Sequence, residues 1–65
     1  MQNQLTTAEM SLLVLITKGL KNKEIAKELN ISVSTVKSHI ENILKKLEVS
    51  NRTQAAVYAV KNDLI

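Results

Sequence analysis

An apolar stripe in the second half of the chain constrains the fold more than any other feature. Its members recur every three or four residues and therefore share one face of a helix: Val33, Val36, Ile40, Ile43, Leu44 and Leu47. Ser32 directly precedes the stripe and is a favoured helix N-cap. The pattern predicts a helix over about residues 33–48, with its apolar face turned to the core.

Start and stop signals in the rest of the chain predict further helices. Thr6 and Glu9 have the spacing of a capping box, and Gly19 suits the left-handed end of a helix. Asn22 can cap a short second helix, and Asn30 can form a left-handed turn after it. With no proline and one glycine, the chain is expected to be all-α, with helices at about residues 7–18, 23–29, 33–48 and 52–61.

The apolar residues of the other three helices predict which sides face the core. The expected inward side chains are Ala8, Leu12, Leu15, Ile16, Ile25, Ala26, Leu29, Ala55, Ala56, Ala59 and Val60. The short second helix, the tight turn and the longer third helix form a helix-turn-helix signature. The whole chain, residues 1–65, is expected to be a single domain with a small core.

Several classes of protein are disfavoured by what the chain lacks. It has no cysteine and one histidine, so neither a disulfide nor an ordinary zinc site is expected, and no cofactor is. No nucleophile–base pair or glycine-rich phosphate loop indicates an enzyme. Its apolar runs are too short to span a bilayer, and the initial MQNQ does not resemble a signal peptide. We expect a cytoplasmic protein.

Charge and the polar side of the third helix point to a polyanionic partner. The net charge is +3 and the pI is near 9.5, a mild basic bias. With the apolar stripe inward, one outward sector holds Ser34, Lys37, Ser38, Glu41 and Lys45, and a second holds Thr35, His39, Asn42 and Lys46. Lysine and serine can hydrogen-bond to base edges, and a helix N-terminus suits phosphate. This face is therefore a candidate reader of DNA.

The segments LTTAEM, NKEIA, TVKSHI, KLEV and RTQA, in this order, strongly resemble the LuxR/NarL-type helix-turn-helix domain. This domain is the output module of many bacterial response regulators, and the resemblance extends from Leu5 to about Ala59. It implies a compact four-helix bundle that places its third helix in the major groove of double-stranded DNA. The implied function is sequence-specific DNA binding in transcription regulation, within a two-component system.

The resemblance also assigns roles to individual residues. The implied base-reading residues are Ser34, Lys37, Ser38 and Glu41. The implied contacts to the DNA backbone are Asn22, Lys23, Ser32, Thr35, His39, Lys45 and Arg52.

Two of these residues allow a second interpretation. Glu41 could accept a hydrogen bond from cytosine N4, but an ion pair with Lys37 or Lys45, four residues away, is favoured. For His39, a neutral phosphate or packing contact is favoured over a pH switch or a ligand. Tyr58, the only aromatic residue, cannot form the stacking platform that single-stranded nucleic acid requires.

The fourth helix is expected to carry a dimer contact. Its outward residues are Gln54, Val57, Tyr58 and Lys61, and members of the resembled family commonly dimerise through this helix. Scattered apolar residues are also normal on a monomer's surface. A two-fold dimer would bind half-sites arranged as an inverted or imperfect repeat. The contact area is small, so dimerisation on DNA alone stays open, and RNA polymerase is a further partner that the resemblance allows.

Two other functions remain as alternatives. One is a helical protein-interaction module that docks an acidic partner, and the other is a promoter-binding domain like region 4 of a sigma factor. TVKSHI and RTQAAVYA favour the LuxR-type interpretation over the sigma factor. The short MQNQ lead favours an output domain excised from a longer regulator, and Asp63 is a poor candidate for a phosphoacceptor. No membrane or small-molecule partner is expected within this domain.

Overall fold

The computed structural model describes residues 5–64 and contains four helices in this range. They are α1 (Thr7–Thr17), α2 (Asn22–Leu29), α3 (Val33–Leu47) and α4 (Arg52–Lys61), and the expected all-α fold is confirmed. Compared with the sequence patterns, α1 and α3 end one residue earlier and α2 begins one residue earlier. MQNQ, from which the signal-peptide and excised-domain expectations came, lies outside the described residues.

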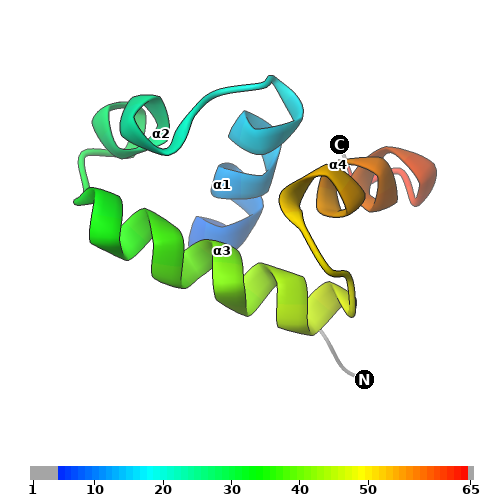
Figure 1. Ribbon diagram of the computed structural model, residues 1–65. Helices are drawn as coiled ribbons and strands as arrows, with labels where there is room; N and C mark the ends of the chain where they lie inside the picture. The colour runs from blue at the N-terminus through cyan, green and yellow to red at the C-terminus, as the bar shows by residue number, and fades with distance from the viewer. Residues whose placement is uncertain (1–4, 65) are drawn as a thin grey trace.

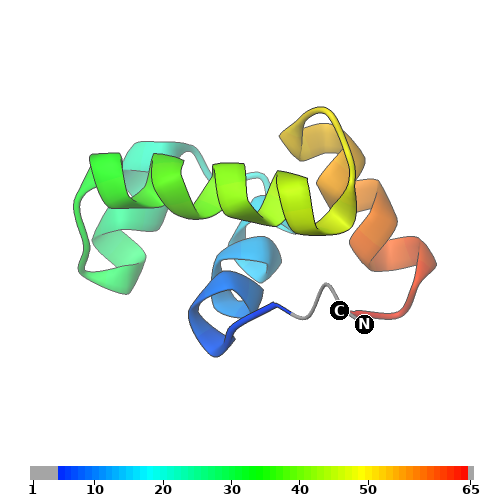
Figure 2. The same ribbon diagram turned by 90° about the horizontal axis from the view of Figure 1, so that it is seen from below.

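α3 is the longest helix and lies along one side of the bundle (Figure 1). Both α1 and α3 pack against each of the other three helices, whereas α2 and α4 lie at opposite ends of α3. Seen from below, α3 lies in front of the other three helices (Figure 2), and none of them crosses in front of it. The bundle therefore buries one side of α3 and leaves the other side open to a partner.

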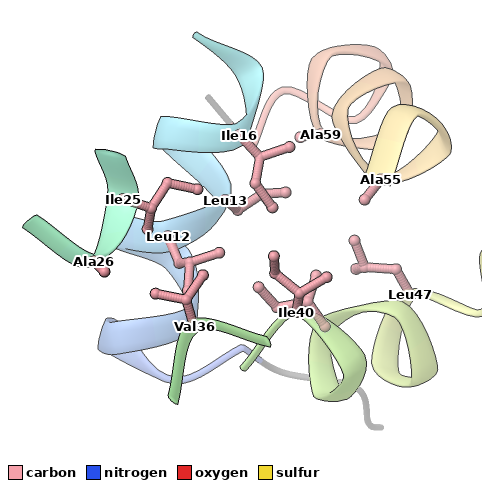
Figure 3. Close-up of a cluster of buried hydrophobic side chains, with 11 residues drawn as sticks. Leu12, Leu13, Ile16, Ile25, Ala26, Val36, Ile40, Leu47, Ala55 and Ala59 are labelled. Atoms are coloured by element: carbon pink, nitrogen blue, oxygen red, sulfur yellow. The ribbon is translucent and has the colours of Figure 1, made fainter. Parts of the chain in front are cut away.

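The core gathers apolar side chains from all four helices (Figure 3). Its buried members are Leu12, Leu13, Ile16, Ile25, Ala26, Val36, Ile40, Ile43, Leu47, Ala55 and Ala59. Leu13, which the sequence patterns did not place inward, has no exposed surface. The two alanines of α4 are small enough to bring its backbone close to α1 and α3.

Three residues that were expected to face the core are exposed, and these expectations were wrong. Val33 is the first residue of α3, next to the turn, and is 36% exposed. Ala8 is exposed because its neighbour Glu9 turns inward, at 4% exposure. Val60 is 63% exposed, because α4 contacts the bundle along the line of Ala55 and Ala59 and the next residue lies beyond that line.

Polar side chains cap the helix starts, as the sequence predicts for α1, α3 and α4. Thr6 and Glu9 form the full capping box, with N–H to oxygen distances of 2.9 and 3.1 Å between donor and acceptor atoms. Ser32 accepts from the Thr35 N–H at 3.0 Å, and Asn51 caps α4 in the same way. The prediction that Asn22 caps α2 was wrong. α2 already begins at Asn22, and the Glu24 carboxylate accepts from the N–H of the preceding Lys21 at 2.7 Å.

A residue with left-handed backbone conformation follows each of the four helices within two positions of its last residue. These residues are Gly19, Asn30, Glu48 and Asp63, with φ of 84°, 58°, 57° and 55°. After each of them, the next N–H donates to a carbonyl five residues back, as in the Schellman motif. In the helix-turn-helix, this bond joins Ile31 N–H to the Ala26 carbonyl at 3.0 Å. The turn between α2 and α3 is thereby fixed by its own backbone.

An ion pair between a buried glutamate and a half-buried lysine joins α1 to α3. Lys46 Nζ lies 2.7 Å from Glu9 Oε1, the same oxygen that caps α1. Burial of the Glu9 carboxyl opposes its ionisation, but hydrogen bonds from Lys46 and Thr6 and the charge of Lys46 outweigh that effect, so the pKa of Glu9 is lowered from its ordinary value. Lys46 was expected in an outward sector beside the DNA-reading face, and that placement was wrong.

Candidate nucleic-acid interface

The outward side of α3 presents a continuous polar face. Its side chains are all exposed: Ser34, Lys37, Ser38, Glu41, Asn42 and Lys45. The face contains hydrogen-bond donors, acceptors and the two positive charges of Lys37 and Lys45. It is rigid, because Val36, Ile40 and Ile43 anchor the opposite side of the same helix in the core.

Two hydroxyl groups lie together at the N-terminal end of α3. Ser32 Oγ and Thr35 Oγ1 are 2.8 Å apart, and Ser32 Oγ also accepts from the Thr35 N–H. One of the two hydroxyl protons is used within this pair, so the other is available to an external acceptor. Together with the positive end of the helix dipole, this arrangement suits an anionic oxygen.

Glu41 does not form the ion pair that its spacing favoured. Within residues 5–64, the one ion pair with a nitrogen–oxygen distance of 4.0 Å or less is that of Lys46 with Glu9. The exposed Glu41 carboxylate makes no such contact with Lys37 or Lys45. Its oxygens remain available as acceptors on the polar face.

The start of α2 contributes a second set of polar groups. Lys23 is exposed and Asn22 is half-buried. Asn22 Oδ1 accepts a hydrogen bond from Arg52 Nη1, at 2.8 Å, although Arg52 begins α4. Arg52 Nη2 is buried without a hydrogen-bond partner. Arg52 is therefore tied to the protein, whereas Lys23 extends into solvent.

The His39 side chain lies on the flank of α3 and faces residues of α1, of α2 and of the turn after α2. It lines a pocket of about 180 Å³ with Ala8, Ser11, Leu29 and Ile31. Its Nδ1 is buried without a partner in the structure. This position is consistent with the packing contact that the sequence analysis favours for His39.

The outward side of α4 carries the residues expected to form a dimer contact: Gln54, Val57, Tyr58 and Lys61, all exposed. Val60, which was expected to face inward, is exposed on the same helix. Two hollows of about 300 and 290 Å³ lie on this helix, and both are lined by Val57 and Lys61. Val57 is 52% exposed, a large share for an aliphatic side chain.

No helix among residues 5–64 is long and apolar enough to cross a membrane. In the same range, no three histidine, aspartate or glutamate side chains gather in a way that could hold a metal ion.

A short helix, a fixed turn and a longer helix with an uncovered polar face define the helix-turn-helix class of DNA-binding domains. The family model "Bacterial regulatory proteins, luxR family" matches residues 3–59. The chain belongs to this family, and it is a LuxR-type DNA-binding domain of the kind found in bacterial response regulators.

Individual relatives agree with this assignment. The chain is 59% identical over 61 residues to the transcriptional regulatory protein LiaR of Bacillus subtilis, and 54% identical over 61 residues to the response regulator VraR of Staphylococcus aureus. Each match covers 94% of this chain and 29% of the relative, so the chain spans less than a third of their length.

Solved structures show the same fold. The response regulator ChrA of a heme-sensing two-component system superposes with a TM-score of 0.91 at 40% identity, over 95% of this chain and 31% of ChrA. The transcription factor GerE superposes with a TM-score of 0.85 at 35% identity, over 92% of this chain and 90% of GerE. The match to GerE shows that a protein of nearly this length adopts this fold.

Proposed function

We propose that the polar face of α3 enters the major groove and reads base edges with Ser34, Lys37, Ser38 and Glu41. The observation that carries this proposal is the exposure of all four side chains on the uncovered side of a helix whose opposite side is fixed in the core. Lys37 can donate to guanine O6 and N7, and Glu41 can accept from cytosine N4. With no ion pair to break, Glu41 loses no internal contact when it meets a base.

The DNA backbone is bound by groups that flank this face. We assign phosphate contacts to Asn22, Lys23, Ser32, Thr35, His39, Lys45 and Arg52. Lys23 and Lys45 are exposed and displace counterions, and the Ser32–Thr35 pair has a hydroxyl proton to donate. His39 and Arg52 each have a buried side-chain nitrogen, so their share of direct contact is the smallest.

The domain binds DNA as a homodimer through α4. Val57 forms the centre of this contact, with Gln54, Tyr58, Val60 and Lys61 around it. Support comes from the exposed apolar side chains and from the hollows along them, which a second copy of the helix would fill. The area is small, so the dimer forms mainly on DNA, on half-sites arranged as an inverted or imperfect repeat.

In its full context, the domain serves as the output module of a cytoplasmic two-component response regulator. Both LiaR and VraR carry regulatory names and are much longer than this chain. In such a protein, the domain would bind its operator and thereby control transcription by RNA polymerase at that site.

Selection from a random pool of duplexes by the purified chain tests this function. The expected result is enrichment of paired half-sites about one helical turn apart. Enrichment of single half-sites would retain DNA reading and refute dimerisation by this chain. If no sequence were enriched and duplex binding did not depend on salt, the DNA-reading face would be refuted and a protein-interaction module would replace it.

A further inference from the structure

The hydrogen bond from Arg52 to Asn22 joins two helices whose backbones do not approach each other. The two residues are 30 positions apart in sequence, and each is the first residue of its helix. No Cα atom of α2 lies within 8 Å of one in α4. Of the side-chain hydrogen bonds within residues 5–64, this one alone connects α2 to α4. Its 2.8 Å length makes it a good hydrogen bond.

The chemistry of arginine decides which way the Asn22 amide points. A guanidinium group only donates hydrogen bonds, so the atom that faces Arg52 must be the amide oxygen. Both N–H donors of Asn22 Nδ2 then face away from Arg52. Phosphate oxygens only accept hydrogen bonds, so this is the orientation of the amide that DNA can use. With the amide turned over, Asn22 would present its Oδ1 to the phosphate oxygen, and both atoms are acceptors.

The surroundings of Arg52 indicate that its side chain contacts the protein itself. One terminal nitrogen is bonded to Asn22 and the other is buried. The side chain lines a hollow of about 360 Å³, together with Gly19, Lys21 and Thr53. In contrast, Lys21 and Lys23, on either side of Asn22, are exposed and give the start of α2 a positive charge.

We propose that Arg52 is a positioning residue for DNA binding, which holds the Asn22 amide so that Nδ2 donates to a DNA phosphate. This inference rests on the proposed contact between the start of α2 and the DNA backbone. Under this inference, Arg52 does not bind phosphate itself and instead orients Asn22, which does. It also makes the register of α2 on the duplex depend on the start of the dimerisation helix.

The first test is the substitution Asn22→Asp. Aspartate keeps an oxygen for Arg52, and its charge strengthens that contact, so the thermal midpoint should be retained or raised. Aspartate has no donor and repels phosphate. Affinity for every duplex, selected or random, should therefore fall by about tenfold or more. Unchanged affinity for a random-sequence duplex at low salt would refute the Asn22 contact.

The second test is a double-mutant cycle with Asn22→Ala and Arg52→Met. Methionine keeps an apolar stem and removes the donors. If Arg52 acts through Asn22, Arg52→Met weakens duplex binding by about fivefold alone and has almost no effect when Asn22→Ala is already present. The dependence of log affinity on log salt keeps its slope, because no phosphate contact of Arg52 is lost.

The control for the second test is Lys23→Ala, which should lower the salt slope by about one unit. Additive effects in the cycle, or a loss of about one unit of slope in Arg52→Met, would show that Arg52 binds phosphate directly and would overturn the proposal. If Arg52→Met does not fold, Arg52→Leu, which also lacks a donor, replaces it, with the same expectations. Failure of the proposed function is separate, because the unsubstituted chain would then show no salt-dependent duplex binding.

Discussion

At the scale of single residues, the Glu9 carboxylate has the most demanding position. It caps α1 and accepts from Lys46 while nearly fully buried. Removal of Lys46 leaves this charge without its cation. We expect Lys46→Ala to lower the free energy of unfolding at neutral pH by about 1–3 kcal/mol, measured by urea denaturation. Lys45→Ala removes an exposed lysine next to it and should have little effect.

The same ion pair predicts how stability depends on pH. The pKa of Glu9 is lowered in the folded state from its ordinary value of 4.5, so folding favours the ionised form. The stabilisation is therefore complete well above pH 4.5 and is lost as the pH falls through the lowered pKa. The difference between the unsubstituted chain and Lys46→Ala should shrink over this acidic range. A difference that stays constant from pH 7 to pH 3 would contradict the role of Lys46.

The left-handed helix ends offer a substitution that should stabilise the protein. Glu48 has a φ of 57°, which costs a residue with a Cβ about 1–2 kcal/mol. Glycine avoids this cost but loses more entropy on folding. We expect Glu48→Gly to raise the free energy of unfolding by about 0.5–1 kcal/mol. Asn30→Gly should gain less, because asparagine tolerates this conformation. A loss of stability in Glu48→Gly would contradict the account.

At the scale of helices, the sequence predicts most of what the structure shows. Capping signals and the apolar stripe indicate all four helices, because both depend on neighbouring residues. The inward side of α4 is predicted less well, and Val60 is exposed. A helical wheel shows which side of a helix is apolar. It does not show how many residues on that side are buried, because this depends on how closely the neighbouring helices pack.

Part of the candidate site is also predictable from the sequence, and part of it is not. The polar side of α3 follows from periodicity, and its exposure agrees with that prediction. The bonds of Lys46 to Glu9 and of Arg52 to Asn22 join residues 37 and 30 positions apart. No local pattern predicts such partners, because they depend on how the helices pack. For the first pair, the sequence offers only a glutamate at the capping-box position and a lysine in an outward sector of α3, and neither signal indicates the other.

At the scale of the whole molecule, the proposed function requires two surfaces to act together on one operator. The proposed DNA-reading face is on α3, and the proposed dimer face is on α4, which lies at one end of α3 (Figure 1). We expect Val57→Asp to leave the thermal midpoint nearly unchanged, because this side chain is half exposed. It should abolish cooperative binding to paired half-sites, as measured by gel shift.

Binding to a single half-site serves as the internal control for Val57→Asp. Its affinity should not change by more than the small effect of one added negative charge. Equal losses on single and paired half-sites would indicate that Val57 acts on the fold or on DNA contact, and not on the dimer.

In the proposed complex, α3 reads base pairs with its polar face. The most direct test is selection from a random duplex pool, carried out in parallel for the unsubstituted chain and for Lys37→Ala. We predict that the two selected sites differ at one base pair of each half-site, where Lys37→Ala loses its preference, and that its affinity falls by about 1–3 kcal/mol. If both proteins select identical sites and Lys37→Ala is weaker on every duplex, Lys37 contacts phosphate, and the assigned reading face is wrong.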